Sequence, residues 1–146
     1  MLMKLGALLG PIVDAAQNHT LAEQARTYSA EGYDSLWSAQ AIGRGFMITD
    51  PFIALAVAAS VTEDVEIGTA IVQVPLYHPM DLAHRVFSLR QICGNRLLLG
   101  VGAGSTEQDF VTFGRDYGSR FGAFDEAMCE LREIFSSGGN GVSALS

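Results

Sequence analysis

Four short apolar runs divide the chain at nearly equal intervals. They cover residues 4–9, 33–38, 65–74 and 96–101. Each run is apolar almost throughout, without regular alternation, which is typical of strands buried on both faces of a parallel sheet. Corresponding positions in the four runs, at Leu5, Leu36, Thr69 and Leu99, are 31, 33 and 30 residues apart. The pattern therefore predicts four buried strands at a regular spacing.

Helical patterns fill the intervals between these strands. Thr20 and Glu23 have the spacing of a capping box at a helix start, and Gly32 stands where that helix would end. Two further helices are predicted to begin at residues 51 and 79, because each of these positions is a proline suited to a first helical turn. Asp50 is expected to cap the first of these helices, and Gly94 and Asn95 are expected to end the second.

Two more helices are predicted after the fourth strand. Ser105 and Gln108 have capping-box spacing, so Ser105 is expected to begin the first of them. The second has a stripe of apolar residues at helical spacing, which predicts packing on the core. The stripe consists of Phe121, Phe124, Met128, Leu131 and Phe135.

Alternating strands and helices at this interval indicate an α/β fold. Consecutive strands joined by helices form right-handed crossovers and therefore a parallel sheet. Four such βα units are compatible with an open, doubly wound sheet and with half of an eight-stranded barrel. Periodicity alone leaves both architectures open.

Composition and charge exclude several classes of protein. The chain has 146 residues, enough for one domain, and 49% of them are hydrophobic. A net charge of −7 argues against a nucleic-acid binder, and no apolar run is long enough to span a membrane. Gly6, Gly10 and Pro11 interrupt the apolar start, so a strand explains it better than a signal peptide. Cys93 and Cys129 form no CxxC motif, and we expect reduced thiols in a cytoplasmic protein.

The stretch LLLGVGAGSTEQDF at 97–110 is a strand followed by a glycine-rich loop and a helix. Its spacing fits neither a dinucleotide fingerprint nor a P-loop, and Ser105 lacks the flanking glycines of a nucleophile elbow. Two interpretations stay open. The glycines serve a tight strand–helix turn, or they allow a ring or another backbone to approach closely.

Other polar residues give weaker indications of chemistry. His78 and His84 lie six positions apart, which is not the spacing of a helical metal pair, so no metal site is predicted. His78 is expected to cap the third helix or to lie at the barrel mouth. Glu107 and Asp109 would point to different sides of a helix, and we expect them to interact with its N-terminus, with a role as an acid–base pair as the alternative. Arg44, between two glycines, is expected to be a solvated loop charge, with an anion contact as the alternative.

Four ordered segments together resemble the bacterial luciferase-like flavin oxidoreductases. They are GYDSLW at 32–37, DPFIALAVAAS at 50–60, EIGTAIVQVPLYHPMDLAHRV at 66–86 and NRLLLGVGAGSTEQDF at 95–110. The resemblance implies a TIM-type (β/α)8 barrel that uses FMN or the deazaflavin coenzyme. Residues 1–136 would then form a luciferase-like (β/α)4 half-barrel, followed by a flexible Gly/Ser-rich tail at 137–146.

The resemblance also implies where a flavin ring would lie. The loop at Ala103, Gly104 and Ser105 would flank the ring, and a bulge with a cis peptide at Ala70 and Ile71 would support its back face. After the second strand, Gln40 and Ala41 replace a carboxylate or histidine pair that the family often has there. Gln40 forms hydrogen bonds but is no general acid, so Gln40 and Ser105 are the candidate hydrogen-bonding residues. Trp37 is expected in the barrel core, with contact to the flavin as the alternative.

A half-barrel would leave its inner apolar face exposed to water. Each fully buried apolar side chain contributes about 1.5–3 kcal/mol, so we expect a homodimer in which a second half-barrel covers that face. Two functions follow from the resemblance. The first is a flavin-dependent monooxygenase or hydride-transfer enzyme acting on a small organic substrate. The second is a truncated, non-catalytic half-barrel that dimerises and binds a small ligand or none, because the strands that would hold a cofactor phosphate are missing.

Overall fold

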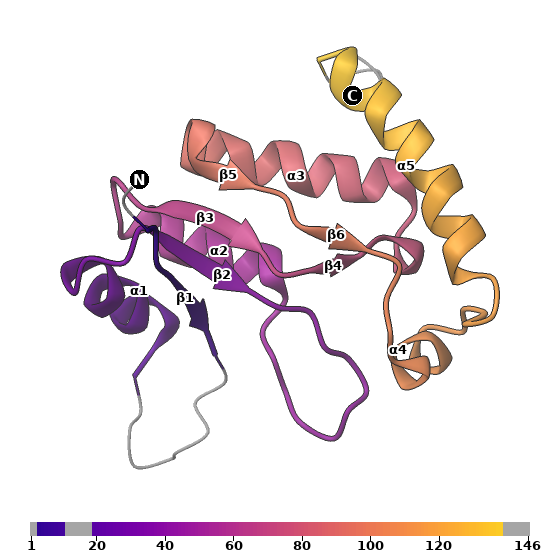
Figure 1. The fold of residues 1–146 in the computed structure, drawn as a ribbon, viewed down its shortest axis with the longest axis horizontal. Coiled ribbons are helices and arrows are strands. Elements are labelled where there is room, and N and C mark those ends of the chain that lie inside the picture. The colour runs from indigo at the N-terminus through magenta and orange to yellow at the C-terminus, as the bar shows by residue number, and fades with distance from the viewer. Residues whose placement is uncertain (1–2, 11–18, 139–146) are drawn as a thin grey trace.

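A computed structural model describes residues 3–10 and 19–138. Four parallel strands form one sheet in the order β1-β2-β3-β5 (Figure 1). Their bounds are β1 Gly6–Leu9, β2 Ser35–Ser38, β3 Glu66–Thr69 and β5 Leu97–Leu98. Two shorter strands, β4 Val72–Gln73 and β6 Val101–Gly102, pair in parallel beyond the ends of β3 and β5. The parallel register confirms the predicted α/β fold of four βα units.

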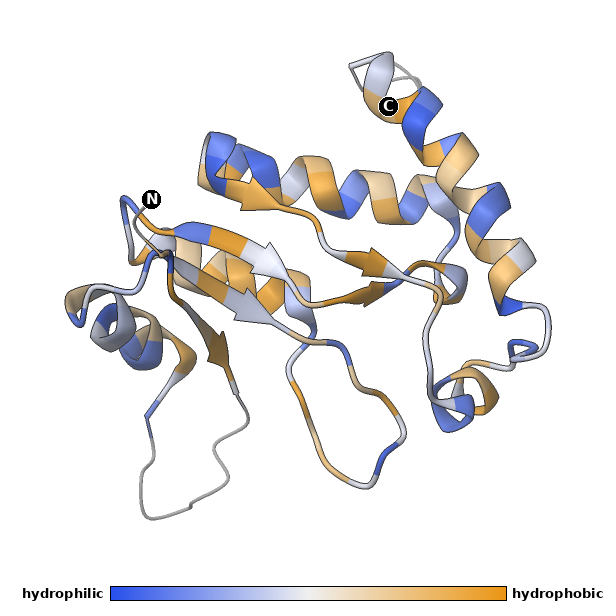
Figure 2. Cartoon of the chain, viewed as in Figure 1, coloured by the Kyte–Doolittle hydropathy of each residue, from blue (hydrophilic) through white to orange (hydrophobic). Residues whose placement is uncertain are grey.

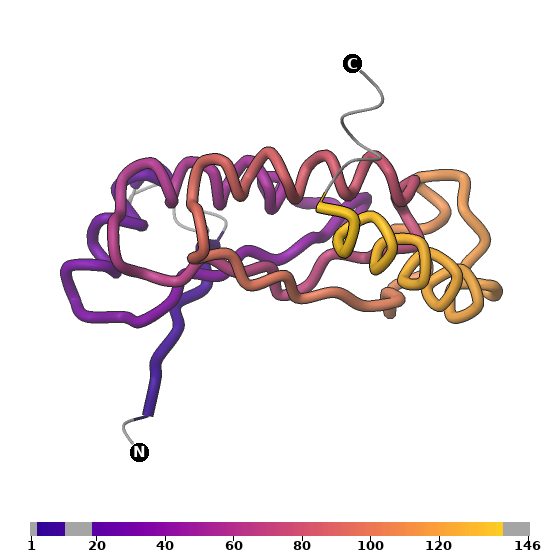
Figure 3. The backbone as a smooth tube through the Cα atoms, turned by 90° about the horizontal axis from the view of Figure 1, so that it is seen from above, coloured from indigo at the N-terminus to yellow at the C-terminus, as the bar shows by residue number. Residues whose placement is uncertain are grey.

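Helices follow each strand and cover one face of the sheet. Seen from above, α2 and α3 run along one side of the strands (Figure 3). The α-helices are α1 Leu21–Ala30, α2 Pro51–Ser60, α3 Pro79–Cys93, α4 Glu107–Thr112 and α5 Arg120–Ser136, and short 3-10 turns cover Val74–Leu76 and Gly94–Arg96. The predicted tail at 137–146 lies outside the described residues except for its first two positions.

Most helix starts follow the local signals in the sequence. The Thr20 hydroxyl accepts a hydrogen bond from the Glu23 N–H, and the Glu23 carboxylate accepts one from the Thr20 N–H, which completes the predicted capping box. Asp50 accepts hydrogen bonds from the first turn of α2. His78 Nδ1 accepts one from the Met80 N–H at 3.2 Å, so its predicted capping role is confirmed.

The prediction that Ser105 caps a helix is wrong. The helix α4 begins at Glu107, its N-cap is Thr106, and no side chain caps it. Ser105 is instead exposed, and its backbone carbonyl accepts a hydrogen bond from the Tyr117 hydroxyl at 3.0 Å. A contact with a residue twelve positions later thus prevails over the local capping pattern.

The predicted third and fourth strands are both interrupted, at neighbouring positions. The peptide bond between Ala70 and Ile71 is cis, as the resemblance implied, and it separates β3 from β4. The Thr69 hydroxyl donates to the Gly100 carbonyl at 2.7 Å and accepts from the Gly100 N–H at 2.9 Å, and the Val72 N–H donates to the same carbonyl. The interruptions therefore bring residues 69–71 and residue 100 into direct contact.

The core lies between the sheet and the helices. Hydrophobic residues gather where helices meet strands (Figure 2). The fully buried side chains there include Leu36, Leu55, Ile67, Leu82 and Leu131.

The opposite face of the sheet is open. Leu8, Trp37, Gly68 and Leu98 occupy one register row on that face, and Leu8 and Leu98 are 53% and 36% exposed. The Trp37 ring lies across the sheet, so close to Gly68 that a Cβ atom there would collide with it. The exposed inner face that the half-barrel predicted is therefore present in the described residues.

Candidate functional site

The carboxyl-terminal ends of the parallel strands meet at one edge of the sheet, where sites form in such folds. Three segments converge there: the loop from β2 to α2, the residues around β4, and the loop from β6 to α4 (Figure 1). The predicted site residues Gln40, Ala70, Ile71, Ala103, Gly104 and Ser105 all lie in these segments.

A completely buried carboxylate joins the three segments. Asp109, in α4, has 0% exposure. Its two oxygens accept hydrogen bonds from Arg44 Nε at 2.9 Å and Arg44 Nη2 at 2.6 Å. Gln73 Nε2 donates to Asp109 at 2.7 Å, and the Ile42 N–H lies 3.4 Å from it. The loop after β2, the end of β4 and the helix α4 therefore share one anionic centre.

This pair corrects one prediction from the sequence and refines another. Arg44 is not a solvated loop charge on its own but is paired with Asp109, with 32% of its side chain exposed. Asp109 lies in the first turn of α4, as expected, but it is fully buried in the ion pair. Burial would raise the pKa of the Asp109 carboxyl, but hydrogen bonds from Arg44 and Gln73 outweigh burial and hold that pKa below its usual range. Asp109 is therefore ionised at neutral pH and unsuited to donate a proton there.

Gln40 is held at both ends of its amide group. Its Oε1 accepts a hydrogen bond from the Gln73 N–H at 2.8 Å, and its Nε2 donates to the Tyr77 hydroxyl at 2.6 Å. The contacts fix Gln40 between β4 and the segment that leads into α3. Of the two candidate hydrogen-bonding residues, Gln40 therefore already has partners within the protein.

Burial, followed by the negative charge of Asp50, raises the pKa of the Tyr77 phenol to about 12. We expect an absorbance step near pH 12 in the wild-type chain that Tyr77→Phe removes. Because an unfolded tyrosine titrates near about pH 10, stability should fall as pH rises from there through the folded pKa. An unchanged step in Tyr77→Phe would contradict this environment.

The glycine-rich loop packs closely on β4 and on the cis peptide segment. A Cβ atom at Gly102 would lie 2.7 Å from Ile71 Cδ1, and one at Gly104 would lie 2.5 Å from Gln73 Oε1. Gly104 also has a φ of +88°, a conformation that strongly favours glycine. The second interpretation of the glycines, close approach by another segment, is therefore the one that the structure supports.

Two residues near the start of α5 hold the outer side of this loop. Arg120 Nε donates to the Gly104 carbonyl at 3.1 Å, and the Tyr117 hydroxyl donates to the Ser105 carbonyl. The Arg120 guanidinium also stacks 3.8 Å from the centre of the Tyr117 ring. The Ser105 side chain makes no hydrogen bond to another described residue, so its hydroxyl is available.

Gln73 is the residue at this edge that sequence reasoning missed. It is only 3% exposed, and its Oε1 has no hydrogen-bond partner among the described residues. A signal was present, because Gln73 is the one polar side chain in the apolar run at 70–76. A polar group in a buried strand needs a partner, and a search for that partner would have led to this edge.

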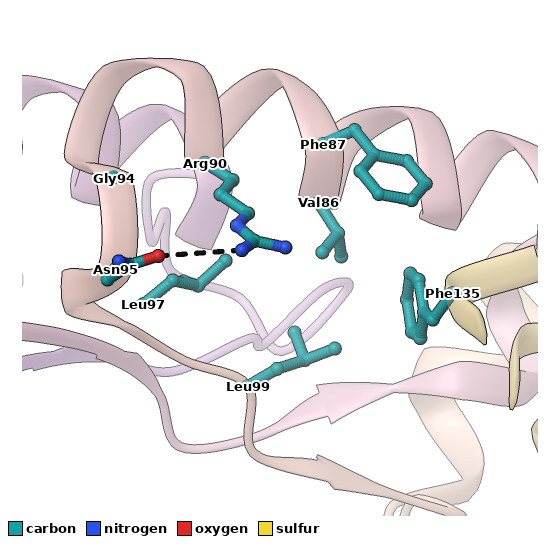
Figure 4. Close-up of a pocket in the computed structure, with 8 residues that line it drawn as sticks. All are labelled: Val86, Phe87, Arg90, Gly94, Asn95, Leu97, Leu99 and Phe135. Atoms are coloured by element: carbon teal, nitrogen blue, oxygen red, sulfur yellow. Dashed lines mark hydrogen bonds between the residues drawn. The ribbon is translucent and has the colours of Figure 1, made fainter. Parts of the chain in front are cut away.

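Two cavities lie at different places in the fold, and one of them is at the candidate site. One of about 270 Å3 lies at the carboxyl-terminal edge, with Gln40, Ala41, Phe46 and Met47 among its lining residues. Another of about 290 Å3 lies between α3, β5 and α5 (Figure 4). Its Arg90 and Asn95 are 3.4 Å apart and bond to each other. Of these two, the first adjoins the residues described above.

Within 3–10 and 19–138, no group of three His, Cys, Asp or Glu side chains is placed to hold a metal ion. None of the described helices is long and apolar enough to cross a membrane.

Comparisons with known proteins agree with the fold. The chain is 32% identical over 120 residues to 4-hydroxyprotoasukamycin monooxygenase of Streptomyces nodosus subsp. asukaensis, covering 78% of this chain and 32% of that protein. Two solved structures share the fold. One is the oxygenating constituent of 3,6-diketocamphane monooxygenase from Pseudomonas putida in complex with FMN (TM-score 0.80, 23% identity, 91% of this chain and 39% of that chain). The other is an F420-dependent secondary alcohol dehydrogenase in complex with an F420–acetone adduct (TM-score 0.73, 22% identity, 92% and 42%).

The matches cover most of this chain but less than half of each relative. The chain spans about a third of the length of the curated relatives it matches and about two fifths of the solved chains. With its four parallel βα units, this confirms the predicted half of a TIM-type barrel. The model of the luciferase-like monooxygenase family matches residues 3–143, and the chain therefore belongs to that family.

Proposed function

We propose that this chain forms the ring-binding half of a flavin- or deazaflavin-dependent oxidoreductase that acts on a small organic substrate by monooxygenation or hydride transfer. The observation that carries the proposal is the contact between the two segments implied to flank the ring: Ile71 lies against Gly102, and Gln73 lies against Gly104. Both contacts are at the carboxyl-terminal edge of the sheet.

The residues at this edge fit a flat, largely apolar ring. Ile71 is 38% exposed and lies next to the glycine-rich loop, which packs closely on Ile71 and on Gln73. The orphaned Gln73 Oε1 and the available Ser105 hydroxyl are the polar groups near that loop. Arg44 is paired with Asp109, and Arg120 donates to backbone carbonyls. The residues at this edge therefore fit the ring of the cofactor and not its phosphate.

Each part of the edge has a role in this proposal. Ala70 and Ile71 support the back face of the ring, and Ala103, Gly104 and Ser105 flank it. The flavin, when bound, supplies the redox chemistry, while the protein orients it and excludes water. Gln40 positions Tyr77 and β4, since both ends of its amide are occupied. A cytoplasmic location belongs to the same proposal and is supported by the free thiols of Cys93 and Cys129.

Ser105→Ala tests the loop assignment. Since the Ser105 side chain is exposed and has no partner among the described residues, the free energy of unfolding should stay within about 0.5 kcal/mol of the wild type. FMN or deazaflavin affinity, measured by fluorescence titration, should fall several-fold, because a hydrogen bond contributes about 0.5–1.5 kcal/mol. Ser88→Ala, on α3, is the control and should change neither quantity. Unchanged affinity in Ser105→Ala would count against the loop.

A second copy of the chain is the proposed partner. Leu8 and Leu98 lie exposed in one register row of the open sheet face, and covering such residues is favourable. Native mass spectrometry should therefore show a species of twice the chain mass, carrying flavin when FMN is added. A single-chain mass at all concentrations would exclude the homodimer.

A dimer that never binds flavin would favour the second candidate function, a non-catalytic half-barrel. The engaged amide of Gln40, which stands where the family often has a proton-transfer group, is the observation that supports that alternative.

A further inference from the structure

The loop from β2 to α2 is attached to α4 through one small cluster. Arg44 reaches Asp109 with two nitrogens, and the Ile42 N–H lies 3.4 Å from the same carboxylate. A Cβ atom at Gly43 would collide with Thr112 on α4, so the loop backbone lies directly against that helix. Gly43 and Gly45 both have positive φ values, and this conformation of the loop therefore depends on glycine at both sides of Arg44.

The same carboxylate also fixes the orientation of Gln73. Its Nε2 donates to Asp109, which leaves Oε1 on the side of Gly104 without a partner. The reverse orientation would place the amide oxygen against a buried carboxylate, an unfavourable arrangement of two acceptors. The position of an acceptor beside the glycine-rich loop thus follows from the ionised Asp109.

We propose that Asp109 is a positioning residue that couples the loop after β2 to the loop after β6, by holding Arg44 and Gln73 at the same time. Weakening the contact between Arg44 and Asp109 therefore also weakens the one between Gln73 and Asp109. The packing of Gln73 against Gly104 is then less well fixed. The inference rests on the proposed function in one respect: the loop after β6 is taken as the segment that flanks the cofactor. Because coupling between two loops is reciprocal, a ring bound at residues 103–105 also orders residues 41–49.

Arg44→Lys and Asp109→Asn in the full chain test this coupling. Lysine keeps the charge but loses the two-pronged contact, and asparagine keeps the size but loses the charge. Hydrogen–deuterium exchange is followed separately at residues 41–49 and at 103–106, without cofactor, with FMN and with the deazaflavin coenzyme. Arg85→Lys and Asp81→Asn are matched controls, since Arg85 and Asp81 form an exposed pair on α3 at 3.0 Å.

The expected result is faster exchange at both loops in each variant, by about tenfold, a change that corresponds to about 1.4 kcal/mol. The decisive part is the increase at 103–106 in Arg44→Lys, because the hydrogen bonds of Arg44 within the described residues go to Asp109 and not to that loop. FMN added to the wild type should slow exchange at 41–49. The controls should match the wild type at both loops.

Exchange that rises only at 41–49 in Arg44→Lys, with 103–106 unchanged, would overturn the coupling. If Asp109→Asn does not fold, Arg44→Lys alone decides, since its carboxylate partner stays in place. Failure of the proposed function is distinguishable: the wild type would then show no protection at any residue with FMN or with the deazaflavin coenzyme, while the cofactor-free comparison of the variants would still report on the coupling.

Discussion

Arg44→Ala is expected to lower the free energy of unfolding by about 1–3 kcal/mol, the usual cost of leaving a buried hydrogen-bonding group without its partner. Asp109 is completely buried, whereas 32% of the Arg44 side chain is exposed, so water that replaces the guanidinium recovers only part of the lost interaction. Since small domains are stable by only about 5–15 kcal/mol, a loss of this size is large. Urea unfolding followed by circular dichroism measures it.

A second substitution makes this prediction sharper. Adding Asp109→Asn to Arg44→Ala removes the unpaired charge, and an asparagine oxygen can still accept from Gln73, so the double variant should be more stable than Arg44→Ala alone. Arg85→Ala, which breaks an exposed pair, should cost less than about 1 kcal/mol. A double variant less stable than Arg44→Ala would show that the buried charge is not the source of the loss.

Gly104→Ala is expected to reduce cofactor binding strongly, because the loop at 103–105 has no room for a Cβ atom at this position. The new Cβ would lie 2.5 Å from Gln73 Oε1 and 2.8 Å from Phe110, and the φ of +88° adds about 1–2 kcal/mol of backbone cost. Because Phe110 is fully buried and Gln73 is held by Asp109, the loop itself has to move. Fluorescence titration with FMN and with the deazaflavin coenzyme measures the loss, which should exceed tenfold.

Gly122→Ala is the matched control for this substitution. Gly122 lies within α5, and a Cβ atom there would meet nothing within 4 Å. Since alanine is the better helix former by about 1 kcal/mol, this variant should be as stable as the wild type or more so, with unchanged affinity. Equal affinities in Gly104→Ala and Gly122→Ala would remove the loop after β6 from the proposed site.

Local sequence patterns were sufficient for much of the fold. The capping box at Thr20, the proline-initiated helices at residues 51 and 79, and the regular strand interval all appear in the structure. Such signals are readable because each involves residues only a few positions apart, whose geometry is set by the backbone of one element. The resemblance to a family added the cis peptide at Ala70 and Ile71, which no pattern of hydrophobicity would have indicated.

By itself, then, the sequence determined the four βα units, most of their boundaries and the edge at which a site would lie. Only the tertiary structure decided that Arg44 pairs with Asp109, 65 positions later, and that Gln73 and Gln40 are fixed by the same cluster. The physical reason is that these bonds join residues from different units. Their partners depend on sheet register and on how glycine-containing loops pack, and a charge in a loop has the same local pattern whether it faces water or a buried carboxylate.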